Sequence, residues 1–261
     1  METLFLSVIL PNALLIFCRI TAFFVVAPVF SYRGVPAHFK IGFCVFVTLL
    51  AYAAIAPTAF VAWDGTFLIA VIKEILIGLV LGFAAALFFQ VMYIAGALMD
   101  MMIGLGIANI VDPVTGAQTP MLGNFKYYLA MLVFLAINGH HYLLIGILNS
   151  FEWVPLEYIW LEHIANGNVS SFLLQSFIQV FIFGFQMAAP IVVALFLVDL
   201  GLGMLAKSAP QFNIFVVGFP IKILSGFIVL ILAMPGLIYL FNRLFELMFT
   251  AMNELMQTIG A

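Results

Sequence analysis

Long apolar runs alternate with short polar stretches along the chain, and the runs are long enough to form membrane-spanning helices. A span needs about 20 mainly apolar residues to cross the ~30 Å hydrocarbon core of a bilayer. Reading from one polar interruption to the next gives residues 4–30, 41–61, 66–99, 127–148, 171–200 and 223–242, with a tail to residue 261. The pattern therefore predicts an all-α, polytopic integral membrane protein with about six apolar helical segments, forming one membrane domain over residues 1–261.

The composition excludes an ordinary soluble protein. Hydrophobic residues make up 66% of the chain and charged residues only 7%, whereas soluble domains have about 45–50% apolar and about 25% charged residues. Most of the surface must therefore face lipid or other protein. The net charge is −3 and the few basic residues form no cluster, which argues against nucleic acid as a partner.

The distribution of basic residues indicates an orientation in the membrane. The fourth connection, residues 149–170, contains Glu152, Glu157 and Glu162 but no Lys or Arg. Under the positive-inside rule it is expected on the non-cytoplasmic side, together with both termini. The reversed topology stays open because the charges are few. The first, third and fifth connections carry the cytoplasmic basic residues of this interpretation: Arg33, Lys40, Lys126, Lys207 and Lys222.

Some apolar runs do not suit a simple bundle of helices in lipid. Residues 66–99 would form a straight helix about 51 Å long, and the last run with its tail is similarly long. Pro11, Pro28, Pro190 and Pro235 lie inside apolar runs, where each removes a helical hydrogen bond that lipid cannot replace. We therefore expect these helices to pack against protein and to tilt, break or extend beyond the lipid.

Polar and small residues inside the runs predict packing faces. Gln175, Gln179 and Gln186 share one helical face, which is suited either to hydrogen bonds across a subunit interface or to lining a pore. Gly78 and Gly82 are four residues apart and would allow another helix to approach closely. We predict that all five residues take part in subunit packing, with pore lining by the glutamines as the open alternative.

Arg19 lies near the middle of the first run, where a charged side chain must face protein or water. Its candidate partners are Glu74, Asp100 and Asp199, and the sequence does not decide among them. Templates for catalysis are lacking: no His pair has the spacing of a helical metal site, and no glycine-rich phosphate loop is present. We therefore predict a protein that is not an enzyme, with no catalytic residue, cofactor or metal.

The connection between the third and fourth runs is neither a good helix nor a hydrated loop. It is about 25 residues long, whereas helix–helix connections commonly have 2–8 residues, and it mixes turn-forming residues with apolar ones. Irregular backbone of this kind is tolerated at membrane depth only when it is buried in protein or lines a cavity. We therefore expect residues 104–122 to be buried in protein or to line a cavity. The turn-forming and apolar residues that define this segment include Gly106, Ile107, Ile110, Val111, Asp112, Pro113, Gly116 and Pro120.

A second marker lies between Ala209 and Lys222, where the chain reads Ala-Pro-Gln-Phe-Asn-Ile-Phe-Val-Val-Gly-Phe-Pro-Ile-Lys. Together with Asp112-Pro113 and Asn138-Gly139-His140-His141, this stretch resembles the FliR/SctT family, the flagellar and type III secretion export-gate subunits. Many members carry Arg where this chain has Lys207, which keeps the charge but loses the guanidinium fork. The loop residues that carry the resemblance are Lys207, Pro210, Gln211, Asn213, Phe215, Gly218, Pro220 and Lys222.

The resemblance implies a non-enzymatic channel component in the bacterial inner membrane, at the flagellar basal body. Members assemble with FliP-like and FliQ-like subunits, contact an FlhB-like switch protein on the cytoplasmic side, and let unfolded substrates pass. The resemblance also implies that the apolar connection, residues 104–122, acts as the plug of the channel, with the eight residues named for that segment as its gating residues. Residues 1–170 would form an N-terminal part that contains the plug. Residues 171–261 would form a long helical hairpin.

Other functions remain open from the residues alone. Injectisome secretion is the first alternative, because flagellar and virulence systems share this subunit. A secondary transporter with broken helices is a second, supported by Arg19 and Pro190, but it predicts an internal repeat and a polar pocket that the sequence does not display. An intramembrane hydrolase is disfavoured by the missing nucleophile–base pair.

Overall fold

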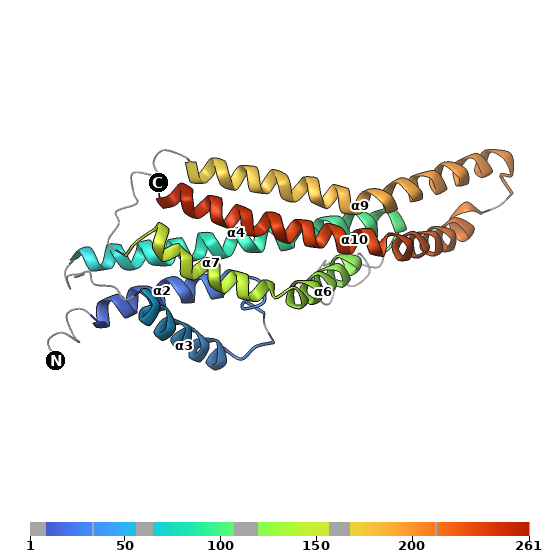
Figure 1. The fold of residues 1–261 in the computed structure, drawn as a ribbon. Coiled ribbons are helices and arrows are strands. Elements are labelled where there is room, and N and C mark those ends of the chain that lie inside the picture. Colours follow the sequence, from blue (N-terminus) through green and yellow to red (C-terminus); the bar gives the residue numbers. More distant parts are fainter. Residues whose placement is uncertain are drawn as a thin grey trace. The chain divides into compact units, whose positions relative to one another are not determined.

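Nearly all of the described residues lie in α-helices, with no strand among them (Figure 1). The computed structural model describes residues 9–32, 34–55, 65–106, 120–156, 168–211 and 213–260. The helices are α2 (Leu10–Val26), α3 (Ala37–Ile55), α4 (Gly65–Ile103), α6 (Met121–Ala136), α7 (Gly139–Trp153), α9 (Asn168–Ser208) and α10 (Ile214–Gly260).

Within these ranges, 4 helices are long and apolar enough to cross a membrane, namely α3, α4, α9 and α10. The number rises to 5 if α6 and α7 are one broken span, and α2 is a shorter apolar helix. The predicted all-α, multi-span membrane protein is therefore confirmed.

The fourth predicted span, residues 127–148, is in fact two helices. The break falls at Ile137 and Asn138, and Asn138 has a left-handed φ of 58°, a conformation that Asn tolerates better than most residues. Helix α6 also begins earlier than predicted, so Lys126 lies inside it and is completely buried. Lys126 therefore does not mark a solvated cytoplasmic connection, as the charge count had assumed.

The prolines divide into two groups. Pro11 lies in the first turn of α2, where its missing N–H costs nothing, and Pro28 follows the end of that helix. The expectation that these two interrupt a span is therefore wrong. Pro190 is inside α9 and Pro235 inside α10, as predicted.

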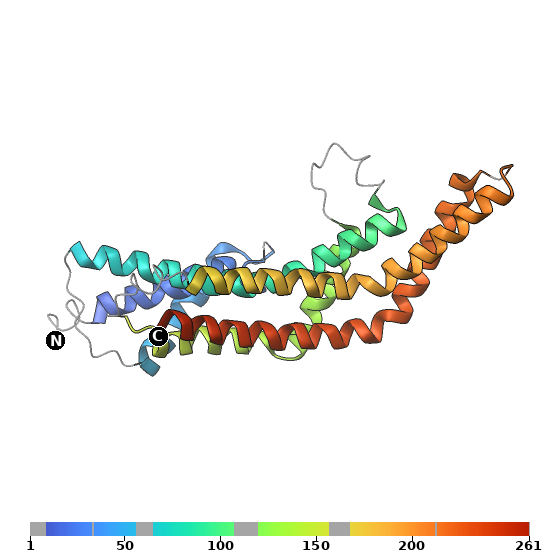
Figure 2. The ribbon, with the colours of Figure 1, turned by 90° about the horizontal axis from the view of Figure 1, so that it is seen from above.

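Helices α9 and α10 run antiparallel and are joined by residues 209–213 (Figure 2). They have 41 and 47 residues, which corresponds to about 60 and 70 Å. Both are far longer than the ~30 Å hydrocarbon core. The last predicted run and its tail are thus one continuous helix.

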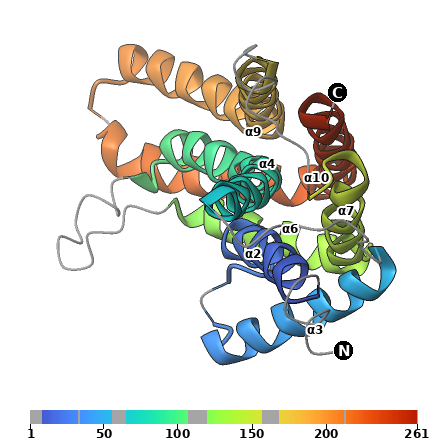
Figure 3. The same cartoon turned by 90° about the vertical axis from the view of Figure 1, so that its left-hand side faces the viewer.

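Packing groups the chain into two compact units, which we describe separately. Unit 1 contains residues 1–88, 138–177 and 246–261, and unit 2 contains residues 89–137 and 178–245. In unit 1, α2 and α3 lie side by side (Figure 3), and α2 also packs on α4. The division at residue 170 made from the sequence stays a prediction.

Gly78 and Gly82 allow α2 to lie directly on α4 within unit 1. A Cβ on Gly78 would collide with the carbonyl oxygen of Arg19, and one on Gly82 would lie 2.9 Å from the carbonyl oxygen of Phe23. The close approach predicted from the glycine spacing is therefore made within the chain. Our assignment of these two glycines to subunit packing is wrong, because α2 of the same chain covers their face.

The core of unit 2 contains a cluster of three phenylalanines from α4, α6 and α10. The ring centroids of Phe89 and Phe134 are 5.3 Å apart, and those of Phe134 and Phe245 are 4.9 Å apart, both in edge-on geometry. All three side chains are almost completely buried. Such pairs contribute about 0.5–1.5 kcal/mol beyond their buried area, so the cluster holds α4, α6 and α10 together in this unit.

Candidate functional site

Most of the predicted gating residues lie outside the described ranges. These are Ile107, Ile110, Val111, Asp112, Pro113 and Gly116. Gly106 and Pro120 lie at the borders of the segment, where the structure describes the chain. The gating role of all eight residues stays a prediction, but the geometry of the two borders bears on it.

The chain leaves α4 through a left-handed glycine. The backbone N–H of Gly104 donates to the carbonyl oxygen of Asp100 at 3.0 Å, which closes the last turn of the helix. Gly104 then has φ = +94°, a conformation that glycine adopts without the steric penalty of a Cβ. Glycine at position 104 thus allows the chain to turn away from the axis of α4.

At the other border, the first turn of α6 is capped by a side chain of α4. Pro120 precedes α6, and the Asp100 carboxylate accepts the backbone N–H of Leu122 at 3.2 and 3.3 Å. A carboxylate at a helix N-terminus satisfies a free N–H and interacts favourably with the helix dipole. A Cβ on Gly96 would collide with the backbone of Gly123. The last turns of α4 therefore hold both borders of residues 107–119.

Sequence reasoning missed this role of Asp100. It named Asp100 only as a candidate partner for Arg19. The cap joins residues that are 22 positions apart, and capping signals in a sequence are read only over a few neighbouring residues. No local pattern could have found it.

The loop motif lies at the turn between α9 and α10. Lys207 lies in the last turn of α9, and Pro210, Gln211 and Asn213 are exposed in the turn that follows. The carbonyl oxygen of Asn213 accepts the backbone N–H groups of Val216 and Val217 at 3.1 and 3.2 Å. The turn thus presents polar side chains outward and starts α10 with backbone hydrogen bonds.

The remaining motif residues lie in the first turns of α10. Lys222 Nζ donates to Asp199 Oδ2 of α9 at 2.9 Å, and a Cβ on Gly218 would lie 3.1 Å from Leu202 Cδ1. Pro220 is inside α10 and exposed. Phe215 is helical, but the structure describes nothing of its side chain. The structure thus brings Lys222 and Gly218 to α9, and Asp199 pairs with Lys222 rather than with Arg19.

The three glutamines on α9 point away from the packed interior. Gln175, Gln179 and Gln186 are all exposed. The isolated chain therefore does not bury them, which is compatible with both a subunit interface and a pore. Their role stays a prediction.

Arg19 is paired with Glu74 in the interior of unit 1. Arg19 Nε donates to Glu74 Oε2 and Nη2 to Oε1, the second at 3.0 Å, and both side chains are completely buried. Arg19 Nη1 also donates to the carbonyl oxygen of Ser150 at 2.9 Å, and Nη2 to that of Val154 at 2.8 Å. The structure thus identifies Glu74 as the partner of Arg19, which the sequence left open.

Lys73 is the second cation of this cluster. Its Nζ lies 3.0 Å from Glu74 Oε1 and donates to the carbonyl oxygens of Pro155 and Leu156 at 3.0 and 2.6 Å. Two cations thus share one carboxylate. Backbone carbonyls at and beyond the end of α7 accept the remaining donors, where the helix dipole is negative. The cluster attaches this end of α7 to α2 and α4.

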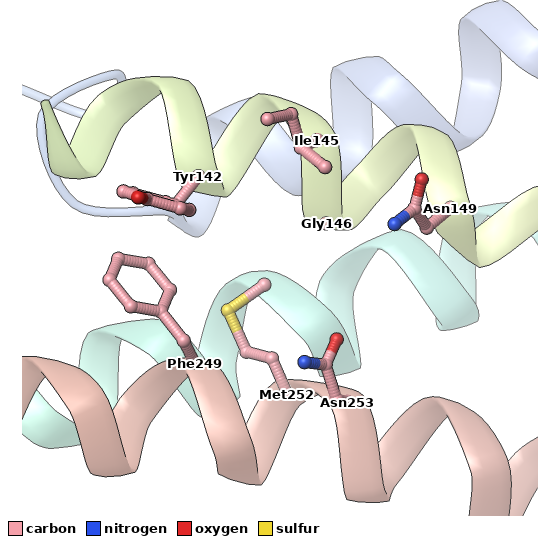
Figure 4. Close-up of a pocket in the computed structure, with 7 residues that line it drawn as sticks. All are labelled: Tyr142, Ile145, Gly146, Asn149, Phe249, Met252 and Asn253. Carbon is pink, nitrogen blue, oxygen red and sulfur yellow. The ribbon is translucent and has the colours of Figure 1, made fainter.

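A shallow cavity of about 100 Å³ lies between α7 and the last part of α10 in unit 1 (Figure 4). Asn149 and Asn253 line one end, and Tyr142 and Phe249 the other, with their ring centroids 5.1 Å apart. No carboxylate, thiol or imidazole lines it. The described residues also contain no group of three or more His, Cys, Asp or Glu able to hold a metal ion. The cavity therefore lacks the carboxylate, thiol and imidazole groups that most often bind metal ions in proteins.

Comparison with known proteins gives a match over nearly the whole chain. The family model described as bacterial export proteins, family 1, matches residues 10–248. The flagellar biosynthetic protein FliR of Bacillus subtilis (strain 168) is 40% identical over 250 residues, which cover 96% of each chain. FliR of Pectobacterium carotovorum subsp. carotovorum is 34% identical over 92% of each chain. FliR of Escherichia coli (strain K12) is 30% identical over 91% of each chain.

Proposed function

This chain belongs to the bacterial export proteins, family 1, and on that premise we propose that it is a membrane subunit of the flagellar protein export apparatus. The observation that carries the proposal is the extent of the match. Residues 10–248 fit the family model, and relatives named flagellar biosynthetic protein FliR align over 91–96% of their own length. The apolar helices α3, α4, α9 and α10 agree with a multi-pass membrane protein.

The subunit works by forming part of a channel, without catalysis or a cofactor. The buried cluster of unit 1 is committed to packing: Arg19 and Lys73 pair with Glu74 and donate to backbone carbonyls at and beyond the end of α7. Energy for transport must then come from other components of the apparatus.

Partner subunits cover much of α9 and α10 in this proposal. Phe185, Phe196 and Leu197 of α9 are 54–62% exposed, and the helix is about twice as long as the hydrocarbon core is thick. Part of this surface must therefore meet protein beyond the lipid. FliP-like and FliQ-like subunits are the partners that the family resemblance implies, and Gln175, Gln179 and Gln186 would hydrogen-bond to them.

Residues 106–120 act as the gate of the channel. The segment is rich in apolar residues and contains Gly106 and Gly116, so it suits a narrow passage that blocks ions by excluding water. Asp100 and Gly104 hold its borders. An unfolded substrate would displace the segment between these two fixed points, and the segment would return when the substrate has left.

The turn between α9 and α10 faces the cytoplasm and contacts an FlhB-like partner. The exposed Lys207 and Gln211 support this assignment, because their polar side chains lie on the surface of the turn.

Complementation tests the proposed function. The chain is expressed in a Bacillus subtilis strain that lacks its own FliR, and swimming in soft agar and filament protein in the medium are measured. We expect both to recover in part, because the relative is 40% identical over its length. Normal membrane insertion and co-purification with the host export subunits, but no export, would contradict the proposal.

A further inference from the structure

The cavity in unit 1 carries two amide side chains at one end, one from each helix that forms it. Asn149 of α7 and Asn253 of α10 both line this end and are exposed (Figure 4). Neither amide takes part in a hydrogen bond among the residues that the structure describes. Each amide has a carbonyl oxygen that accepts hydrogen bonds. The amide end of the cavity therefore offers two acceptors to a molecule outside the chain.

The walls next to the amides are apolar. Ile145 of α7 and Met252 of α10 lie between the amide end and the rings of Tyr142 and Phe249 at the other end. Met252 is buried, whereas Tyr142 and Ile145 are 55% and 50% exposed. A side chain that fills this cavity would need an apolar stem and a polar head.

The surface around the cavity does not suit lipid. The exposed side chains in the last part of α10 include Glu246, Thr250, Asn253, Glu254 and Gln257. Charged groups of this kind are excluded from the hydrocarbon region of a bilayer. Tyr142 and Ile145 nevertheless leave apolar area exposed next to them, and aromatic residues and Met are enriched where proteins contact one another. This combination favours a protein as the occupant of the cavity.

The charge next to the amide end is negative. Glu152 follows Asn149 by one helical turn, Glu254 is the neighbour of Asn253, and both carboxylates are exposed. Residues 139–156 and 246–260 contain no Lys or Arg. The next basic residue along α10 is Arg243, about 15 Å before Asn253 along the helix. The amide end therefore attracts a cation.

The buried cations of unit 1 do not fill this place. Arg19 and Lys73 also approach α7, but both are buried and share the Glu74 carboxylate. They therefore give the cavity no exposed positive group. A cation at Asn149 and Asn253 must come from another molecule.

We propose that the cavity between α7 and the last part of α10 binds an arginine side chain of a partner subunit. A guanidinium has five N–H donors in one plane, so it can donate to the amide oxygens of Asn149 and Asn253 together. Its apolar stem would lie along Ile145 and Met252. A lysine ammonium is a compact point charge without this planar fork. The inference rests on the proposed function in one respect, namely that the chain works in a complex of several subunits.

Photocross-linking identifies the occupant in the assembled complex in cells. The cross-linking residue benzoylphenylalanine replaces Ile145, and mass spectrometry locates the cross-linked segment. The same residue at position 196 of α9, where the native Phe196 is 54% exposed, reports that partner subunits are present. We expect the probe at position 145 to cross-link to a partner subunit, at a segment with an arginine within a few residues.

Two substitutions on α10 test the chemistry of the cavity. Asn253→Arg places a cation of the chain itself at the amide end, and we expect the cross-linked fraction to fall about tenfold, because a charge-assisted contact is replaced by repulsion. Thr250→Arg is the matched control. Thr250 is also exposed on α10 but does not line the cavity, so this variant should lower the cross-linked fraction much less.

Two further variants keep the test independent of the folding of Asn253→Arg. Asn149→Arg adds the cation from α7 and should have the same effect, whereas Asn253→Asp adds a negative charge and should retain or raise the cross-linked fraction. Replacing the cross-linked arginine of the partner by Glu should lower the fraction, and combining that change with Asn253→Arg should restore it. Failure of the combination to restore cross-linking would overturn the proposal.

Other occupants of the cavity would also overturn it. These are a lipid, a second copy of this chain, or a partner segment without arginine, each found at position 145 in complexes that cross-link at position 196. Complementation decides the proposed function separately. A chain that restores export but gives one of these results would disprove only the arginine site, whereas an assembled chain that restores no export would disprove the proposed function.

Discussion

Arg19 and Glu74 form a bidentate ion pair that is completely buried between α2 and α4, although the two residues are 55 positions apart. The pair is completed by Lys73, which shares the same carboxylate. Single removals from a buried ion pair commonly cost 3–5 kcal/mol, because they leave an uncompensated charge. Because Arg19 and Lys73 share the Glu74 carboxylate, removing Glu74 should cost more stability than removing Arg19.

Glu74→Gln should destabilise the protein more than Arg19→Met. The first change leaves two buried cations without a counter-charge, whereas the second leaves Glu74 paired with Lys73. We expect a loss of about 3–5 kcal/mol for Glu74→Gln and a smaller loss for Arg19→Met. Thermal unfolding of the complex in detergent shows which of the two variants loses more stability. Equal losses of stability, or a larger loss for Arg19→Met, would mean that Lys73 does not share the carboxylate.

Asp100→Ala should loosen the start of α6. Loss of a cap commonly costs about 0.5–2 kcal/mol, and Asp100→Asn is the matched control because it keeps an acceptor oxygen. Hydrogen exchange of the backbone amides at residues 121–124 should become faster in Asp100→Ala than in Asp100→Asn. Unchanged exchange in the alanine variant would show that the Asp100–Leu122 hydrogen bonds do not hold this border.

Replacing Gln175, Gln179 and Gln186 together by Leu should leave membrane insertion intact but weaken co-purification of the partner subunits. Each hydrogen bond between helices in a membrane contributes about 0.6–2 kcal/mol. Removing all three glutamines should therefore weaken partner binding enough to be measured. The amount of the chain in the membrane fraction is the control. Unchanged co-purification would assign this face to lipid or to the pore.

Lys207→Glu should reduce export without affecting insertion, because the exposed turn is proposed to contact a cytoplasmic partner. Lys207→Arg keeps the charge and serves as the control. Filament protein in the culture medium measures export, and membrane fractionation measures insertion. Loss of insertion in Lys207→Glu would mean that the residue only sets the topology.

The sequence predicted the helical membrane fold, because this fold depends on local composition. Runs of apolar residues identified α4, α9 and α10, and the turn-forming residues after residue 103 agree with the end of α4 at Ile103. The family resemblance came from a contiguous motif, Ala209 to Lys222, which can be read without any tertiary structure.

What the sequence did not predict depends on contacts between distant residues. The pairing of Arg19 with Glu74, the cap from Asp100 to Leu122, and the close approach of Gly96 to Gly123 all join separate helices. Gly78 and Gly82 were correctly read as a site of close approach, but only the fold identifies α2 as the helix that approaches. The count of basic residues also placed Lys126 in a cytoplasmic connection, whereas this residue is buried in α6.

The ion permeability of cells that express the complex with residues 107–117 deleted tests the central claim most directly. We predict an assembled complex with a lowered membrane potential, and the same effect at smaller size for Ile110→Asp, because a charged side chain would keep water in the passage. A complex that fails to assemble after the deletion, together with a wild-type membrane potential for a correctly assembled Ile110→Asp variant, would contradict the account and make the segment a structural linker.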